Sequence, residues 1–193
     1  MFRDISSKLT DKLISLKTID PEDREIYEFG IQHIFITIFN ISTVLLLGLL
    51  LGDFKEAMIF IFAFIPLRIF AGGFHFNSPI MCYIFSSYFV AVVLLAMRYL
   101  SIPLLIYCLL YCLSGIIILT FAPVEDKNKP LDQLEKKVYR KRTIIVFVAE
   151  NMIMLLFCSL KFYIAAKCIM VSIIALGLLI VLGVIKNYLL SVK

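Results

Sequence analysis

A histidine and a cysteine flank a break between two apolar runs of this sequence. His75 and Cys82 lie at the two ends of the stretch His75-Phe76-Asn77-Ser78-Pro79-Ile80-Met81-Cys82. An imidazole beside a thiol is the minimum set of groups for nucleophilic cysteine catalysis, in which His75 would act as general base and then as general acid. On one straight helix the two residues would stand about 10 Å apart, which is too far for proton transfer. The chemistry therefore requires a turn between them.

The residues between the imidazole and the thiol predict such a turn. Proline disfavours a helical conformation in the preceding residue and suits the first position of a helix, so Ser78 is expected to cap a helix that begins at Pro79. Cys82 then occupies the fourth helical position, where the helix dipole and a neighbouring imidazolium favour the thiolate. Gly72 and Gly73 supply backbone freedom on the histidine side. The alternative is that the cysteine is a small packing residue and the histidine a hydrogen-bonded side chain without catalytic function.

Arg68 precedes the two glycines by a few residues. Polar groups at the edge of a bilayer are costly and usually have a function. A guanidinium here can hold a carboxylate of the substrate or support an oxyanion. The alternative is that Arg68 only extends its charged end to the lipid headgroups.

The composition indicates a membrane protein. Of the 193 residues, 62% are hydrophobic, and the mean hydropathy is +0.99, whereas soluble domains are about half apolar. We therefore expect one all-α integral membrane domain over residues 1–193, with about six transmembrane helices. The apolar runs cover about 31–52, 55–71, 80–98, 101–122, 143–160 and 163–185. The second run is short and carries Arg68, so a tilted, partly spanning or re-entrant segment is also compatible with it.

The chain divides into four parts within this domain. Residues 1–19 predict an amphipathic helix, because Phe2, Ile5, Leu9, Leu13 and Leu16 recur at steps of three and four. This helix is expected to lie on the membrane surface, and packing on the protein's own core is the alternative. Residues 20–122 form a catalytic half with four spans, which opens with Asp20 as a helix cap and Pro21 after it. Residues 123–142 form a basic loop, and residues 143–193 hold two further spans.

The basic residues predict the orientation. With six spans and a cytoplasmic N-terminus, 15 of the 19 Lys and Arg residues fall on the cytoplasmic side, as the positive-inside rule requires. Both termini, the basic loop and the His75/Cys82 turn are then cytoplasmic. The patch of basic residues in 123–142 attracts anionic lipid headgroups, and its shortness between two spans argues against nucleic-acid binding.

The remaining polar residues do not predict a metal site or a cofactor. The five cysteines are an odd number and four of them lie in apolar runs, so free thiols are expected. The two histidines, His33 and His75, are not part of a His-Glu-x-x-His motif. Glu150 lies inside the fifth apolar run, where a polar contact between helices or between protomers is the favoured interpretation.

The turn region resembles the AgrB family, the accessory gene regulator protein B of Gram-positive quorum-sensing systems. The matching pattern is Arg68, Gly72-Gly73-Phe74-His75, Ser78 and Cys82. Two outlying matches support it. Gln32 lies where AgrB-like proteins carry a functionally important glutamine, and Ala122-Pro123 opens a loop like the one before the family's basic stretch. The size, hydropathy and order of motifs agree over essentially the whole chain.

The resemblance implies a cysteine endopeptidase in the cell membrane that matures a quorum-sensing peptide. By analogy, Cys82 attacks an AgrD-like propeptide and forms an acyl-enzyme thioester, and a cysteine or serine of the propeptide then closes a thiolactone or lactone ring. Gln32 would serve the imidazole or the oxyanion, or else form only a helix-end hydrogen bond. Lys127, Lys129, Lys136 and Lys137 would dock the acidic tail that such substrates are expected to carry. The resemblance also allows a homodimer.

Two other functions remain open at this stage. A non-catalytic peptide transporter or membrane scaffold would not need His75 or Cys82. A different intramembrane hydrolase would use both residues but would release a linear product.

Overall fold

The computed structural model describes residues 2–76, 78–125 and 131–191, and within them every regular element is a helix. The predicted all-α class is therefore confirmed for these residues. The elements are α1 (Phe2–Ser15), the 3-10 helix η1 (Pro21–Asp23), α2 (Arg24–Leu51), α3 (Phe54–Ala71), α4 (Pro79–Tyr99), α5 (Leu104–Phe121), α6 (Gln133–Ser159) and α7 (Tyr163–Ser191).

Among the described residues, five helices are long and apolar enough to cross a membrane. They cover Pro21–Leu51, Ile80–Tyr99, Leu104–Phe121, Gln133–Ser159 and Tyr163–Leu190, which is the character of a multi-pass membrane protein. α3 is the second predicted span, and its 18 residues give a length of about 27 Å, slightly less than a bilayer core of about 30 Å. It also carries Lys55, Glu56 and Arg68. The six-span count and the cytoplasmic placement of the termini remain predictions.

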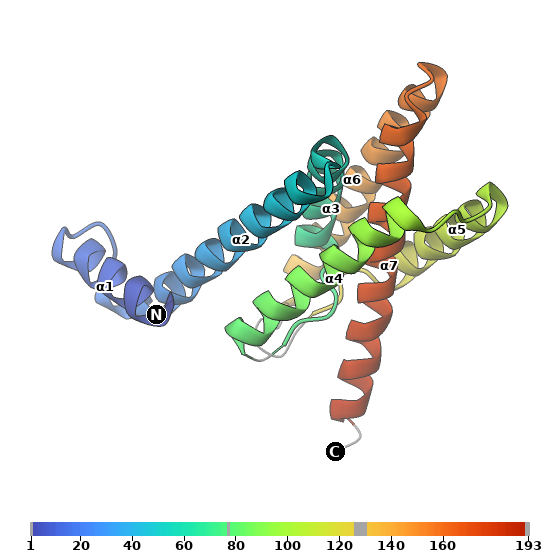
Figure 1. The fold of residues 1–193 in the computed structure, drawn as a ribbon. Helices are drawn as coiled ribbons and strands as arrows, with labels where there is room; N and C mark the ends of the chain where they lie inside the picture. The colour runs from blue at the N-terminus through green and yellow to red at the C-terminus, as the bar shows by residue number, and fades with distance from the viewer. Residues whose placement is uncertain (1, 77, 126–130, 192–193) are drawn as a thin grey trace.

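α7 forms the centre of the bundle, with α3, α5 and α6 packed against it (Figure 1). Its side chains Ile173, Leu176 and Ile180 are completely buried, because a helix that is apolar on all sides is stabilised by burial on all sides. Gly177 brings α5 close, since a β-carbon there would lie 2.6 Å from the β-carbon of Ser114. Small residues at such crossings let two helix backbones approach.

α1 packs against α2 through its polar face. Ser6 and Thr10 are completely buried, whereas Ile5, Leu9 and Leu16 are 38%, 39% and 63% exposed. α2 leaves the bundle at its N-terminal end, and α1 lies beside that end (Figure 1). Ile5 and Leu9 of α1 are therefore not covered by a protein core, and the membrane surface remains the predicted environment for them.

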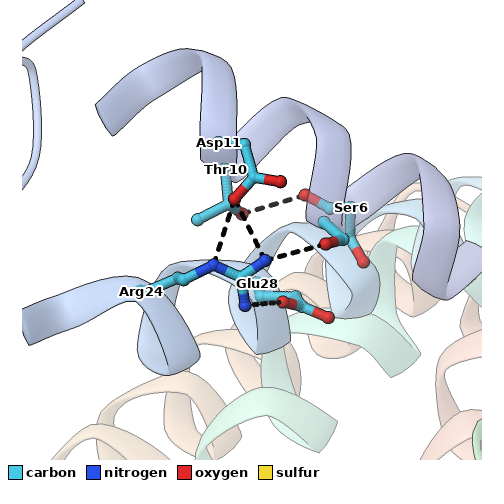
Figure 2. Close-up of polar contacts among 6 residues, drawn as sticks. Ser6, Thr10, Asp11, Arg24 and Glu28 are labelled. Atoms are coloured by element: carbon cyan, nitrogen blue, oxygen red, sulfur yellow. Dashed lines mark hydrogen bonds and ion pairs between the residues drawn. The ribbon is translucent and has the colours of Figure 1, made fainter. Parts of the chain in front are cut away.

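Arg24 of α2 joins the two helices. Its guanidinium donates to Asp11 and Ser7 of α1 at 3.0 and 2.9 Å, and to Glu28 one turn further along α2 at 2.9 Å. Figure 2 shows Arg24 between Asp11 and Glu28, with Ser6 and Thr10 on the neighbouring turns of α1.

The predicted loop over 123–142 is wrong for its second half. α6 begins at Gln133, about ten residues before the predicted span, so half of the basic stretch is helical. The reason is local. Asp132 accepts a hydrogen bond from the backbone N–H of Glu135, and the Glu135 carboxylate accepts one from the N–H of Asp132, which is a capping box.

Candidate active site

The structure brings His75 and Cys82 together. The sulfur of Cys82 lies 3.6 Å from Nδ1 of His75, which is within the distance at which a thiol and an imidazole exchange a proton. Both side chains are only partly buried, so a substrate can reach them. The predicted turn is confirmed in its geometry.

The start of α4 places the cysteine. Ser78 has an extended backbone and Pro79 is the first helical residue, as the sequence predicts. The N–H of Cys82 bonds to the carbonyl of Ser78 at 2.9 Å, so the thiol is in the first turn. The Ser78 hydroxyl, however, makes no capping hydrogen bond, so Ser78 acts through its backbone.

The glycines before His75 adopt conformations that other residues avoid. Gly72 has φ +71° and Gly73 has φ +125°, a region in which L side chains are strained. A β-carbon on Gly72 would overlap the carbonyl of Val124, and one on Gly73 would overlap the guanidinium of Arg68. Both positions therefore require glycine for close approach as well as for backbone conformation.

Arg68 contacts the loop and the histidine. Its guanidinium donates to the carbonyl oxygens of Gly72 and Phe74, and its Nη2 lies 3.3 Å from Nε2 of His75. The sequence predicted a role at the oxyanion or at a substrate carboxylate. That role stays a prediction; the guanidinium lies behind the imidazole, on the side opposite to Cys82.

Two distant segments support the loop that carries His75 from behind. The N–H of Phe74 bonds to the carbonyl of Leu179 in α7 at 2.8 Å, and Val124 bonds through its N–H to Ala71 at 2.9 Å. The ammonium of Lys186 donates to the His75 carbonyl and lies 5.6 Å from the centre of the Phe74 ring. The backbone on both sides of the imidazole is therefore held by residues of α7 and of the segment after α5.

Gly183 of α7 lets the helix and the loop approach. A β-carbon there would lie 2.8 Å from the carbonyl carbon of Gly73 and 2.9 Å from the nitrogen of Phe74. α7 is thus in direct contact with the backbone of the loop.

Aromatic rings cover one side of the site. Phe74 lies 4.9 Å from Phe76 and 5.2 Å from Phe85, centroid to centroid, and Phe85 continues to Phe89 at 6.1 Å. Phe85 and Phe89 are on α4, one and two turns after Cys82. This cluster is an apolar wall next to the thiol.

Gln32 does not join this group. Asn40 and Thr43 of α2 contact α4 through Ser87 and Tyr83, but Gln32 precedes Thr43 by about 16 Å along the helix. Among the described residues no hydrogen bond links Gln32 to the imidazole or the thiol. A hydrogen bond between Gln32 and His75 is therefore not present, and Arg68 lies beside Nε2 of the ring. A role of Gln32 at the oxyanion stays a prediction.

The predicted tail-docking lysines are only partly described. Lys127 and Lys129 lie outside the described residues. Lys136 forms an ion pair with Glu125 at 3.0 Å, whereas Lys137 is exposed on the first turns of α6.

Other thiols and carboxylates lie away from the site. Cys108, Cys112 and Cys158 are exposed, Cys168 is buried, and all are free. Within the described ranges no three His, Cys, Asp or Glu side chains are grouped as a metal would require. Glu150 is buried, and in the described part of the chain its carboxylate oxygens have no hydrogen-bond partner.

The sequence analysis missed Lys186, Val124 and the aromatic partners Phe85 and Phe89. Lys186-Asn187 is the first polar pair after the long apolar run of α7, and this break in hydropathy was the one available signal. Asn187 donates to the carbonyl of Glu125 at 2.8 Å, so the pair contacts both loops at this end of the bundle.

The chain is similar to proteins of one family along almost its whole length. The family model AgrB, described as Accessory gene regulator B, matches residues 6–185. Putative AgrB-like protein 2 of Clostridium perfringens strain 13 is 29% identical over 187 residues, covering 90% of this chain and 86% of that protein. Accessory gene regulator protein B of Staphylococcus intermedius is 29% identical over 120 residues, covering 62% and 63%. Protein FsrB of Enterococcus faecalis is 29% identical over 159 residues, covering 79% and 62%. No solved structure matches the chain.

Proposed function

This chain belongs to the accessory gene regulator B family, and we propose that it is a membrane-embedded cysteine endopeptidase that cleaves an AgrD-like quorum-sensing propeptide and closes the product into a ring. The observation that carries the proposal is the contact of 3.6 Å between the Cys82 sulfur and Nδ1 of His75. The position of Cys82 in the first turn of a long helix supports it, because the helix dipole favours a thiolate there.

The first step is acylation of the enzyme. Nδ1 of His75 takes the thiol proton, and the thiolate of Cys82 attacks the scissile carbonyl. This transfer requires the tautomer with the ring hydrogen on Nε2, so Nε2 carries a proton before and after it. The guanidinium of Arg68 is then held by the carbonyls of Gly72 and Phe74 and not by Nε2. The imidazolium then gives its proton to the leaving amine, and the acyl group remains on Cys82 as a thioester.

Backbone amides at the start of α4 are suitable donors for the oxyanion of this step. The first amides of a helix have no acceptor within the helix, and the Ser78 side chain provides none. Helical side chains lean toward the N-terminus, which directs the Cys82 sulfur to the amides of Ile80 and Met81.

The second step is ring closure. A thiol or hydroxyl inside the bound acyl segment attacks the thioester, His75 takes its proton, and the Cys82 thiolate leaves and is reprotonated. Water would compete as a nucleophile. The wall formed by Phe74, Phe76 and Phe85 supports cyclisation over hydrolysis because it keeps water from one side of the thioester. The distribution of Lys and Arg supports a site on the cytoplasmic side.

The test is mass spectrometry of the chain in liposomes with an AgrD-like propeptide. Wild type should show an acyl adduct and a cyclic product, and both should be lost in Cys82→Ala and His75→Ala. Cys112→Ala removes an exposed thiol of α5 and should process normally. Unchanged processing by Cys82→Ala would overturn the proposal in favour of a transporter or scaffold, and a linear product alone would indicate a simple hydrolase.

A further inference from the structure

A cationic cavity lies between the end of α5 and the first turns of α6. Its volume is about 240 Å³. Three basic side chains and no acidic one are part of its described lining. The lining includes Phe121, Pro123, Gln133 and the basic residues Lys136, Lys137 and Arg140. A lining of this kind suits an anion.

Lys137 and Arg140 are the two charges available to such an anion. Lys136 is already paired with Glu125. Arg140 donates one N–H to the carbonyl of Leu119 at 3.3 Å, and a guanidinium has five N–H donors, so others remain for a ligand. Within the described residues neither Lys137 nor Arg140 forms an ion pair. An arginine with free N–H groups matches the oxygens of a phosphate.

The depth of the cavity corresponds to the headgroup layer of a bilayer. Phe121 is the last residue of the span formed by α5, and the apolar part of α6 begins at Thr143. Arg140 and Lys137 precede Thr143 by about 4.5 and 9 Å along the helix. The headgroup layer is about 5–7 Å thick on each side of the hydrocarbon, so the backbone of Arg140 lies within it. The backbone of Lys137 lies just beyond it, and its long side chain reaches back into the layer.

An apolar side chain is exposed beside the charges. Phe121 lines the cavity and is 50% exposed. A ligand with an anionic group and an apolar portion fits this combination, whereas an acidic peptide uses only the charges.

We propose that this cavity binds the headgroup of an anionic phospholipid, with its phosphate on Lys137 and Arg140 and its acyl chains along Phe121. The cavity wall is directly connected to the catalytic loop. Pro123 precedes Val124, which bonds to Ala71 at 2.9 Å and accepts the N–H of Gly73 at 3.4 Å. A bound lipid therefore supports the segment against which the His75 loop rests. This inference goes beyond the proposed peptidase activity.

The experiment measures lipid retention and does not depend on catalysis. The chain is reconstituted in nanodiscs containing equal amounts of phosphatidylglycerol and phosphatidylcholine, and retained lipids are counted by native mass spectrometry. Wild type should retain phosphatidylglycerol in preference. The Lys137→Gln/Arg140→Gln variant should lose this preference by roughly tenfold. Lys55→Gln/Lys161→Gln loses the same charge at exposed positions outside the cavity and should retain lipid as wild type does.

Several results would overturn the proposal. Equal retention by the two double variants, or no preference in wild type, would show that the cavity does not select a headgroup. Displacement of the lipid by free inorganic phosphate would indicate a soluble-anion site. Cross-linking of a glutamate-rich peptide to Lys137 in phosphatidylcholine nanodiscs, lost when Arg140 is also replaced, would indicate a peptide site. Circular dichroism of each variant separates loss of binding from loss of the helical fold.

Discussion

Arg68 and Cys82 lie on opposite sides of one imidazole. Nη2 of Arg68 is 3.3 Å from Nε2 of His75, and the Cys82 sulfur is 3.6 Å from Nδ1. A base at Nδ1 requires the tautomer with the ring hydrogen on Nε2, so the guanidinium, which has only donors, is then held by the carbonyls of Gly72 and Phe74. We infer that Arg68 positions the loop that carries the ring and places positive charge near the sulfur, which is the part of a third residue beside a cysteine and a histidine.

Arg68→Lys should reduce propeptide processing by about 100-fold, because a lysine cannot reproduce the planar contacts with the carbonyls of Gly72 and Phe74 and a small displacement of the ring is costly. The rate of acyl-adduct formation measures this. Arg98→Lys is the matched control, since Arg98 binds Asp53 and the carbonyl of Leu51 at the other end of α4. Equal rates for the two variants would contradict a role for Arg68 at the imidazole.

Gly73→Ala should abolish most processing. The new β-carbon would overlap Arg68 at a φ of +125°, so the guanidinium or the loop has to move, and a loss of about 100-fold or more is expected. Gly30→Ala in α2 meets nothing within 4 Å and should stabilise that helix slightly. Cleavage rate and helix content are measured for both. If Gly73→Ala cleaves normally, the loop does not need its observed conformation.

Lys186→Met should lower the cleavage rate by about tenfold, because it removes a charge-assisted hydrogen bond to the carbonyl of His75. Hydrogen exchange of the Phe74 amide, which bonds to Leu179, should become faster in the same variant. Lys167→Met is the control, since Lys167 contacts the carbonyl of Met97 and the ring of Tyr107 at the opposite end of α7. A slower rate without faster exchange would mean that Lys186 acts on the substrate and not on the loop.

The contact between Glu125 and the start of α6 should weaken in acid. The backbone N–H of Leu131, and after it the ammonium of Lys136, hold the pKa of the Glu125 carboxyl below its usual value of 4.5. A carboxyl with a lowered pKa in the folded state stabilises the fold above its unfolded pKa, and this contribution is lost as the pH falls through the folded pKa. The rate of hydrogen exchange of the Leu131 amide, corrected for the intrinsic rate of that amide, should therefore be constant near neutral pH. It should rise below about pH 4.5. Glu125→Gln should show little pH dependence, and the same profile in both proteins would refute the contact.

Arg24→Gln should release α1 from α2, since Arg24 provides the ionic contacts between them that Figure 2 shows. The contacts are partly exposed, so solvent screens them and each contributes little to stability. Trypsin cleavage after Lys17 should become faster by a few-fold. Glu25→Gln changes the neighbouring charge only and should be cleaved like wild type. Unchanged cleavage of Arg24→Gln would mean that Ser6 and Thr10 hold the helix alone.

Much of the helix pattern was predictable because its signals are local. Hydropathy runs placed α3, α4 and α5 within about three residues of their observed limits, and Ser78-Pro79 predicted the first residue of α4. α2 begins seven residues before its predicted run, and α7 continues six residues past its predicted end. The start of α6 was not predicted, although Asp132 and Glu135 have the spacing of a capping box. The many basic residues around them indicated a loop. Hydropathy identifies α3 as a span less clearly than the other helices, because three charged residues interrupt its apolar run.

The sequence by itself determined that the chain is a helical membrane protein, that it belongs to the AgrB family, and that a proline turn separates His75 from Cys82. Periodicity, proline geometry and motif order are properties of neighbouring residues, so they can be read without a fold. Only the tertiary structure decided that Arg68, and not Gln32, lies behind the imidazole. It also decided that Lys186, which is 111 positions from His75, supports the loop. These contacts depend on how α7 packs against α3 and α5, and no local pattern specifies which distant side chain that packing brings to the site.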